Sequence, residues 1–160
     1  MAQARDIYTP IPSDRFNTET YINPTGKKPN TSKIPYGCFV DNLGIFDAIF
    51  FGMSLRKAKQ TDLIYRLALI TAYKALEYTE YIRGRGIYTR RVGIFYRQAS
   101  DDYREVNSRQ EVSIYFIPGG YRAFALGHIN YFFKFWGPSF SVNTIYLSSL
   151  AAIQTAYSSL

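Results

Sequence analysis

Cysteine and histidine are almost missing from this sequence. Its 160 residues include one cysteine, Cys38, and one histidine, His128. A lone cysteine excludes a disulfide within the chain and is typical of a reducing compartment. Because Cys38 stands outside any cationic or histidine-bearing motif, we interpret it as a small bystander residue rather than a nucleophile.

Long apolar runs are missing as well. No stretch approaches the roughly 18 apolar residues that a membrane-spanning helix needs. Polar, proline-containing sequence follows Arg5 and Asp6, where a signal peptide would have its apolar run. We therefore expect a cytoplasmic location and no membrane partner.

Acidic residues are fewer than basic ones. There are 12 Asp and Glu against 19 Lys and Arg, a formal net charge of +7, which raises nucleic acid as a partner. The clustered charges, however, lie in two loop-like stretches rich in glycine or proline: Arg83, Arg85, Arg90 and Arg91, and Lys27, Lys28 and Lys33. We interpret them as solvated surface charge and expect no nucleic-acid partner.

Apolar and aromatic side chains, by contrast, are plentiful. Hydrophobic residues make up 47% of the chain and aromatic residues 18%, which suits the core of one globular domain. Prolines favour loops from Met1 to Pro35, and the apolar segment from Tyr36 to Met53 favours a loop and short turns against the core.

Helices and one strand are predicted in the middle of the chain. Ser54 suits an N-cap, and the segment from Ser54 to Tyr81 is the clearest helical region of the chain. The segment Arg91 to Tyr96 predicts a buried strand, and Tyr121 to Phe135 has a helical pattern. One apolar face recurs at helical spacing in the first region: Ile64, Leu67, Ala68, Ala72, Ala75 and Leu76.

Two neighbouring carboxylates, Asp101 and Asp102, are a candidate metal or acid-base pair. Residues adjacent in sequence point in different directions, and no His, Cys or Glu set accompanies them. Helix capping is the better explanation, and we expect no metal site.

The most informative stretch is the last one. Ser139 to Thr144 is β-prone, and from Leu147 to Leu160 apolar residues return at spacings of three and four, continuing from Tyr146: Leu150, Ile153, Tyr157 and Leu160. This pattern predicts a strand, a sharp turn and an amphipathic helix. In enzymes such a turn raises one side chain, here Tyr146, in front of a helix N-terminus.

The segment GPSFSVNTIYLSSLAAIQTAYSSL resembles the nucleophile segment of β-ketoacyl synthases, roughly GPS-x-x-(V/I)-D-T-A-C-S-S. The resemblance is to the ketosynthase domain of fungal iterative non-reducing polyketide synthases and covers about residues 14–160 of a partial N-terminal domain, 1–160. Earlier blocks that carry it include Asp14-Arg15-Phe16-Asn17, Asn23-Pro24-Thr25-Gly26-Lys27, Phe50-Phe51-Gly52-Met53-Ser54, Gln98-Ala99-Ser100-Asp101-Asp102 and Ile129-Asn130-Tyr131-Phe132-Phe133-Lys134-Phe135.

The resemblance implies an α/β, thiolase-like fold, present as a partial N-terminal half with two to four strands. It also implies acyl transfer and decarboxylative condensation of malonyl units. The implied partners are a second ketosynthase and an acyl carrier protein whose phosphopantetheine delivers the acyl group, with no cofactor on this chain. Phe132, Phe133 and Phe135 are implied to be buried. In an isolated half, these side chains and Trp136 are expected to lose their cover. The resemblance also implies that two helices meet near Thr61 and Asp62, because the related sequences have proline where this chain has Leu63.

The departures from the family pattern fall at the site itself. Tyr146 stands where the family has its acylated cysteine. Asn143 replaces the family's aspartate, and Leu147 replaces the serine that follows the cysteine. A phenol with a pKa of about 10 has little anion at neutral pH. The family's two catalytic histidines lie in a C-terminal half that this chain does not include, and His128 matches neither. We therefore predict no catalytic residue and an inactive remnant.

The departures from the family pattern, these three included, are biased in type. Each of them can arise by one C-to-T or G-to-A transition, a bias that indicates a decaying duplicated gene: Asn143, Tyr146, Leu147, His128, Arg97, Glu80, Lys57, Lys74, Leu55 and Leu63. Three alternatives stay open: a noncatalytic binding or dimerisation module acting on an intact synthase, some activity through partner chains, and a poorly folded product.

Overall fold

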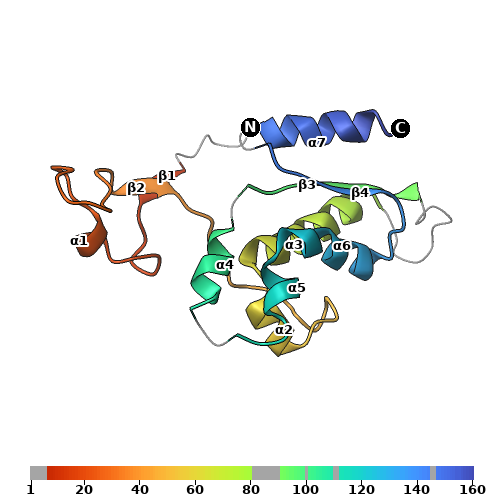
Figure 1. Cartoon of the computed structure of the whole chain (residues 1–160), viewed down its shortest axis with the longest axis horizontal. Coiled ribbons are helices and arrows are strands. Elements are labelled where there is room, and N and C mark those ends of the chain that lie inside the picture. The colour runs from red at the N-terminus through yellow and green to blue at the C-terminus, as the bar shows by residue number, and fades with distance from the viewer. Residues whose placement is uncertain (1–6, 81–90, 100, 110–111, 145–146) are drawn as a thin grey trace. The chain divides into compact units, whose positions relative to one another are not determined.

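The structure is a computed structural model that describes residues 7–80, 91–99, 101–109, 112–144 and 147–160. The chain divides into two compact units, Met1–Leu43 and Gly44–Leu160 (Figure 1). No helix in the described part of the chain is long and apolar enough to cross a membrane.

The first unit contains a small antiparallel ribbon where loops were predicted. Strand β1 (Tyr8–Pro10) pairs with β2 (Tyr36–Cys38), and the rings of Tyr8 and Tyr36 stack with centroids 5.5 Å apart. Helix α1 (Thr18–Tyr21) lies between them in the sequence and is capped by the Asn17 side chain. The prolines therefore shorten the elements without excluding them, because Pro10 occupies the last position of its strand.

Helices α2 (Leu55–Gln60) and α3 (Leu63–Tyr78) confirm the predicted pair. The backbone N–H of Lys57 donates to Ser54 Oγ at 3.2 Å, which confirms the N-cap. Thr61 ends α2, and Asp62 caps α3 by accepting from the Ile64 N–H at 2.9 Å. The Asp62 N–H in turn donates to the Gly119 carbonyl oxygen, at 2.8 Å, which ties the junction to a distant segment.

The α3 helix ends in a left-handed residue. Glu80 has a φ of 56°, and its N–H donates to the Glu77 carbonyl oxygen at 3.0 Å. This conformation costs a residue with a Cβ about 1–2 kcal/mol, and glycine is the usual residue after a helix. The resemblance to ketosynthases implies glycine at this position, so Glu80 replaces a residue that would adopt this conformation without the cost.

We expect Glu80→Gly to stabilise the chain by about 1 kcal/mol, because it removes the left-handed strain. Thermal unfolding would register this as a rise in Tm of about 2–4 °C. Glu80→Ala is the matched control, since it removes the same charge and keeps the Cβ. An equal gain in both variants would attribute the effect to charge and contradict the strain explanation.

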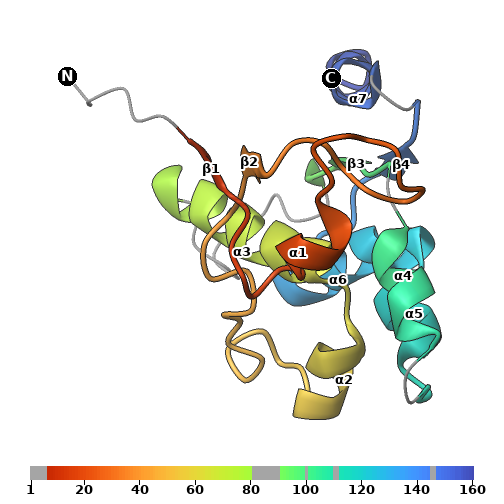
Figure 2. The same ribbon diagram turned by 90° about the vertical axis from the view of Figure 1, so that its left-hand side faces the viewer.

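The second unit has a parallel two-stranded sheet between helical layers. Strand β3 (Ile94–Arg97) pairs with β4 (Ser139–Val142), from Ile94 opposite Ser139 to Arg97 opposite Val142. Helix α7 (Ser148–Tyr157) packs on one face of this sheet, and α3 and α6 (Ala125–Phe133) lie on the other (Figures 1 and 2). The predicted buried strand is therefore present, but it is only half-buried.

The segment from Tyr115 to Phe133 is more broken than its pattern predicted. Helix α5 (Phe116–Gly120) was not predicted, because it contains Pro118-Gly119-Gly120. It is followed by the 3-10 turn η2 (Arg122–Phe124), and only then by α6. Proline is tolerated in a first helical turn, where its missing N–H would have no partner in the helix.

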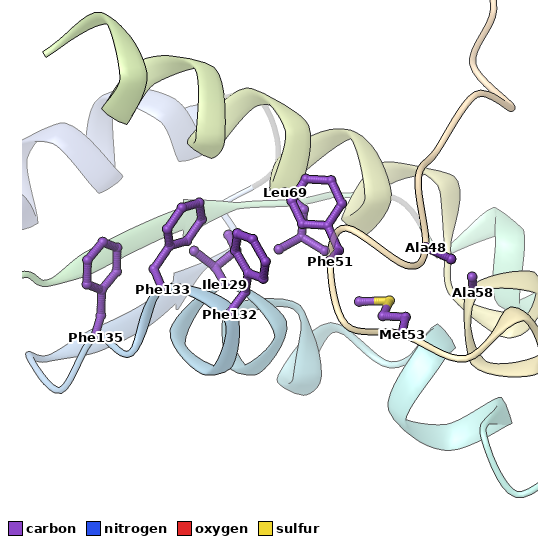
Figure 3. Close-up of a cluster of buried hydrophobic side chains, with 9 residues drawn as sticks. All are labelled: Ala48, Phe51, Met53, Ala58, Leu69, Ile129, Phe132, Phe133 and Phe135. Carbon is purple, nitrogen blue, oxygen red and sulfur yellow. The ribbon is translucent and has the colours of Figure 1, made fainter. Parts of the chain in front are cut away.

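Aromatic side chains dominate the core of the second unit (Figure 3). The Phe51 and Phe132 rings lie 4.8 Å apart, and Phe133 stacks on Phe135 at 5.4 Å. All four are buried in this chain's own core, so the expectation that Phe132, Phe133 and Phe135 would lose their cover was wrong, and only Trp136, 75% exposed, fits it. The buried cluster also includes Ala48, Met53, Ala58, Leu69 and Ile129.

Candidate active site

The candidate site begins where β4 runs beside β3. The Gly137 N–H donates to the Val92 carbonyl oxygen at 3.2 Å, and the Ile94 N–H donates to that of Pro138 at 2.9 Å. A Cβ on Gly137 would lie 2.3 Å from the Val92 oxygen, so only glycine allows this close approach. The backbone contact aligns the two strands and directs β4 toward the turn that precedes α7.

The turn between β4 and α7 is held on both sides. The Thr144 N–H donates to Ser148 Oγ at 2.8 Å, and the Leu147 N–H donates to the Thr144 carbonyl oxygen at 3.3 Å. Ser148 is fully buried. Residues 145 and 146 lie outside the described residues, so the position of Tyr146 stays a prediction, while the strand before it and the helix after it are as predicted.

Helix α7 packs on the sheet with its small residues. Ser148 and Ala152 are buried, whereas the large apolar side chains lie on the outer side. The exposed fractions are 65% for Leu150, 66% for Ile153, 74% for Tyr157 and 105% for Leu160. We call these four residues the α7 stripe. The predicted amphipathic helix exists, but its apolar face is exposed to solvent in this chain.

The start of α7 has no side-chain cap. Leu147 is the N-cap residue and its side chain makes no capping hydrogen bond, because it has no acceptor. The resembled family has serine here, a preferred N-cap residue. Leu147 is also 65% exposed.

We expect Leu147→Ser to raise the free energy of unfolding by about 0.5–2 kcal/mol, because the hydroxyl can accept from an amide of the first turn. Urea unfolding followed by circular dichroism measures the difference. Leu147→Ala is the matched control, because it removes the exposed leucine without adding an acceptor. No difference between the two variants would contradict the capping explanation.

The other candidate residues have structural surroundings. Asp101 occupies the N-cap position of α4 (Asp102–Asn107), but its side chain makes no cap hydrogen bond and pairs with Arg122 at 2.6 Å instead. The capping prediction was therefore wrong for Asp101. Cys38 is free and exposed on β2. Among the described residues, no group of three His, Cys, Asp or Glu could hold a metal ion.

His128 lies inside the fold. Its Nε2 is 2.9 Å from the Pro118 carbonyl oxygen, to which it donates when protonated at that nitrogen, and its ring is 6.3 Å from that of Tyr65. Burial lowers the pKa of His128, the Lys57 charge lowers it further, and the bond to Pro118 acts in the opposite direction. These contacts connect α5 to α6.

Because folding favours neutral His128, the chain should lose stability on acidification. The stability from the neutral ring is fully present above the unfolded pKa of about 6.5, and it is lost as pH falls toward the lowered folded value. Thermal unfolding measured between about pH 7.5 and pH 5 shows the loss as a fall in Tm. His128→Gln should weaken this dependence of Tm on pH. Asp62, whose pKa burial raises, acts in the opposite sense, so Asp62→Asn is the control. An unchanged slope in His128→Gln would contradict the assignment.

One surface feature was missed by the sequence pattern. An open apolar groove of about 440 Å³ lies along α3. Ile64 and Leu67, expected to face the core, are 40% and 41% exposed, while Tyr65 and Leu69 are buried. The spacing of apolar residues correctly predicted a helix, but it did not determine which side of α3 packs against the core. The groove is lined by Ile64, Leu67, Ala68, Thr71, Ala72, Ala75, Tyr96, Arg97 and Ile129.

Comparison with known proteins identifies the family. Residues 1–160 match "Beta-ketoacyl synthase, N-terminal domain", so this chain belongs to the β-ketoacyl synthase family. It is similar to the oxazolomycin ketosynthase domain OzmH KS7 of Streptomyces albus, with a TM-score of 0.83 and 27% identity over 95% of this chain and 26% of that one. A module 6 ketosynthase of the bacillaene synthase of Bacillus subtilis has a TM-score of 0.78 at 24% identity, over 98% of this chain and 24% of that one, which supports the fold. The predicted α/β, thiolase-like fold is confirmed.

Curated relatives place the chain more narrowly. It is 71% identical over its whole length to the non-reducing polyketide synthase PKS19 of Phaeosphaeria nodorum. It is 67% identical, over 97% of its length, to the non-reducing polyketide synthase gsfA of Penicillium aethiopicum. The chain spans 9% of the length of each relative. The predicted resemblance to the ketosynthase of fungal non-reducing polyketide synthases is therefore confirmed.

Proposed function

We propose that residues 1–160 form a partial ketosynthase domain of a non-reducing polyketide synthase that no longer condenses malonyl units. The observation that carries the proposal is Tyr146, which stands where the family pattern has its acylated cysteine. A phenol with a pKa of about 10 is about 0.1% ionised at pH 7, against about 3% for a thiol of pKa 8.5. The phenol of Tyr146 is therefore too weak a nucleophile to accept an acyl group.

Two features of the backbone support this proposal. Glu80 stands in a left-handed conformation, and Leu147 leaves α7 without a side-chain cap. In both places the resembled family has a residue without that cost. A site that still supported catalysis would gain nothing from either change, whereas decay of a duplicated gene has no reason to avoid them.

The partners of the parent reaction belong to the same proposal. In an intact synthase, an acyl carrier protein would deliver the acyl group on phosphopantetheine, and a second ketosynthase would complete the dimer. This chain holds no cofactor of its own in that scheme. The proposal keeps residues 1–160 as one partial domain, and its cytoplasmic location stays a prediction.

Mass spectrometry tests the inactive site. The purified chain, incubated with acetyl and malonyl thioesters, should keep its unmodified mass. Because Cys38 is exposed, a Cys38→Ser variant is run beside it to separate background thiol acylation from reaction at the candidate site. A stable acyl adduct on Tyr146 would overturn the proposal.

A second candidate function is a noncatalytic module that binds an intact synthase. The α7 stripe favours it, because three large apolar side chains of α7, together with Leu160 just after the helix, are exposed and such patches mark interaction sites. The chain would then lower product formation by the Phaeosphaeria nodorum relative when added in excess. Unchanged product formation, with no co-elution of the two proteins, would reject this function.

A further inference from the structure

A closed, basic loop in the first unit has no role in the function proposed above. It runs from Asn23 to Lys33, and we call it the basic loop. Its ends are paired: the Asn23 N–H donates to the Ser32 carbonyl oxygen at 2.8 Å, and the Ser32 N–H donates to that of Tyr21 at 2.9 Å. A bridge between Ile22 and Ser32 completes the closure.

The inside of the basic loop is also held. Asn23 Oδ1 accepts from the Thr25 hydroxyl at 2.7 Å, and the Thr31 hydroxyl donates to the Lys28 carbonyl oxygen at 2.7 Å. Gly26 has a φ of 63°, and the Lys33 stem covers it so closely that a Cβ would meet Lys33 Cε. A loop constrained at so many points loses little conformational entropy when it binds.

The charge of the basic loop has one sign. Lys27, Lys28 and Lys33 are all exposed, and no Asp or Glu occurs between Thr20 and Val40. Among the described residues, none of the three lysines forms a salt bridge. Three cations on a constrained loop therefore have no carboxylate partner in the described part of this chain.

An apolar pocket adjoins the basic loop. It has a volume of about 410 Å³ and is lined by Phe16, Tyr21, Asn30 and Ser32, the last two from the loop itself. The rings of Phe16 and Tyr21 meet edge to face, with centroids 6.0 Å apart. Two rings at right angles form a corner that suits one apolar side chain better than a stack of bases.

We propose that the basic loop and this pocket are a docking site for an acidic segment of a partner protein. One apolar side chain of that segment fills the pocket, and its carboxylates pair with Lys27, Lys28 and Lys33. Lysine presents a single point charge, and the loop has no arginine to form the bidentate contacts that specific phosphate recognition favours. A protein segment therefore fits better than a nucleic acid.

Binding to an immobilised full-length chain tests the proposal. The probe is a short fluorescein-labelled peptide of Asp and Glu with one central Leu. The comparison peptide has Ser in place of this Leu. Changing Lys27, Lys28 and Lys33 to Gln should weaken binding by about tenfold, or about 1.4 kcal/mol, and flatten its salt dependence. Phe16→Ala should remove the preference for Leu over Ser and leave the salt dependence unchanged.

The controls separate position from total charge. Changing Lys59, Lys74 and Lys134 to Gln removes the same charge elsewhere and should alter the affinity by less than about twofold. Equal weakening in both triple variants would overturn the proposal, as would tighter binding of duplex DNA or of phosphatidylserine vesicles than of the peptide. Circular dichroism of each variant confirms that the fold is kept. None of these outcomes depends on residue 146, so a negative result would contradict the docking site without affecting the proposal of an inactive site.

Discussion

In size-exclusion chromatography, the isolated 160-residue chain is expected to elute as oligomers. The cause is the α7 stripe, whose Leu150, Ile153 and Tyr157 are each at least 65% exposed. Covering one large apolar side chain contributes about 1.5–3 kcal/mol, so the four residues of the stripe together offer about 6–12 kcal/mol. Two copies that cover each other's stripe gain twice this amount, about 12–24 kcal/mol, against an association cost of about 4–15 kcal/mol. The balance therefore favours self-association at high concentration and dissociation on dilution.

Charged substitutions should abolish this association. Leu150→Lys, Ile153→Lys and Tyr157→Lys, made together, are expected to shift the chain to a monomer, because three ammonium groups oppose burial of the stripe. The charge-matched control places the lysines at Ser149, Gln154 and Ser159, which are exposed and polar on the same segment, and it should remain oligomeric. Multi-angle light scattering gives the mass of each variant.

A monodisperse wild-type monomer that unfolds cooperatively would contradict this prediction. It would mean that the chain tolerates the exposed stripe as a domain in its own right. Monomers in both triple variants would instead assign the association to net charge.

Tyr146→Cys, made in a Cys38→Ser background, is expected to restore acylation without restoring condensation. A thiol of ordinary pKa has about 30 times more anion at pH 7 than a phenol, and a helix N-terminus lowers a thiol pKa further. Residue 146 immediately precedes Leu147, the N-cap of α7. We therefore expect acylation by an acetyl thioester to accelerate at least about 30-fold over the Cys38→Ser parent.

Condensation should still be absent, because the chain has one histidine. His128 is buried, bonded to the Pro118 carbonyl and held with a lowered pKa. It cannot act as the pair of imidazoles that the family uses to stabilise an enolate.

A matched control places the same substitution at the other end of the helix. Tyr157→Cys, at the C-terminal end of α7 and exposed, should be acylated more slowly, because the negative end of the helix disfavours the thiolate. Intact-mass time courses compare the two variants. Equal rates would show that position 146 has no special activation, and acylation of the wild type at Tyr146 would contradict the inactive site.

Local signals in the sequence were sufficient for several elements. Ser54 caps α2 through its own side chain, three residues from the amide that it accepts from, so neighbouring residues located the start of this helix. The junction of α2 and α3 followed from the resemblance to the family, and the structure adds the Asp62 cap. Local sequence also predicted β4 from its β-prone residues and α7 from apolar residues at spacings of three and four. The family also followed from sequence blocks alone. The position of Tyr146 stays a prediction, because this residue lies outside the described residues.

Tertiary structure decided which faces are covered. Asp101 pairs with Arg122, 21 residues away, rather than capping its own helix. Helix α5 forms although its Pro118-Gly119-Gly120 sequence disfavours a helix, and the Pro118 carbonyl oxygen accepts a hydrogen bond from His128 of α6. Phe132, Phe133 and Phe135 are buried because they share one core cluster with residues of other segments, among them Phe51 and Leu69. The α7 stripe is exposed because Ser148 and Ala152 let the helix approach the sheet closely. Periodicity determines that a helix has an apolar face, and only the packing of distant segments determines whether that face is buried.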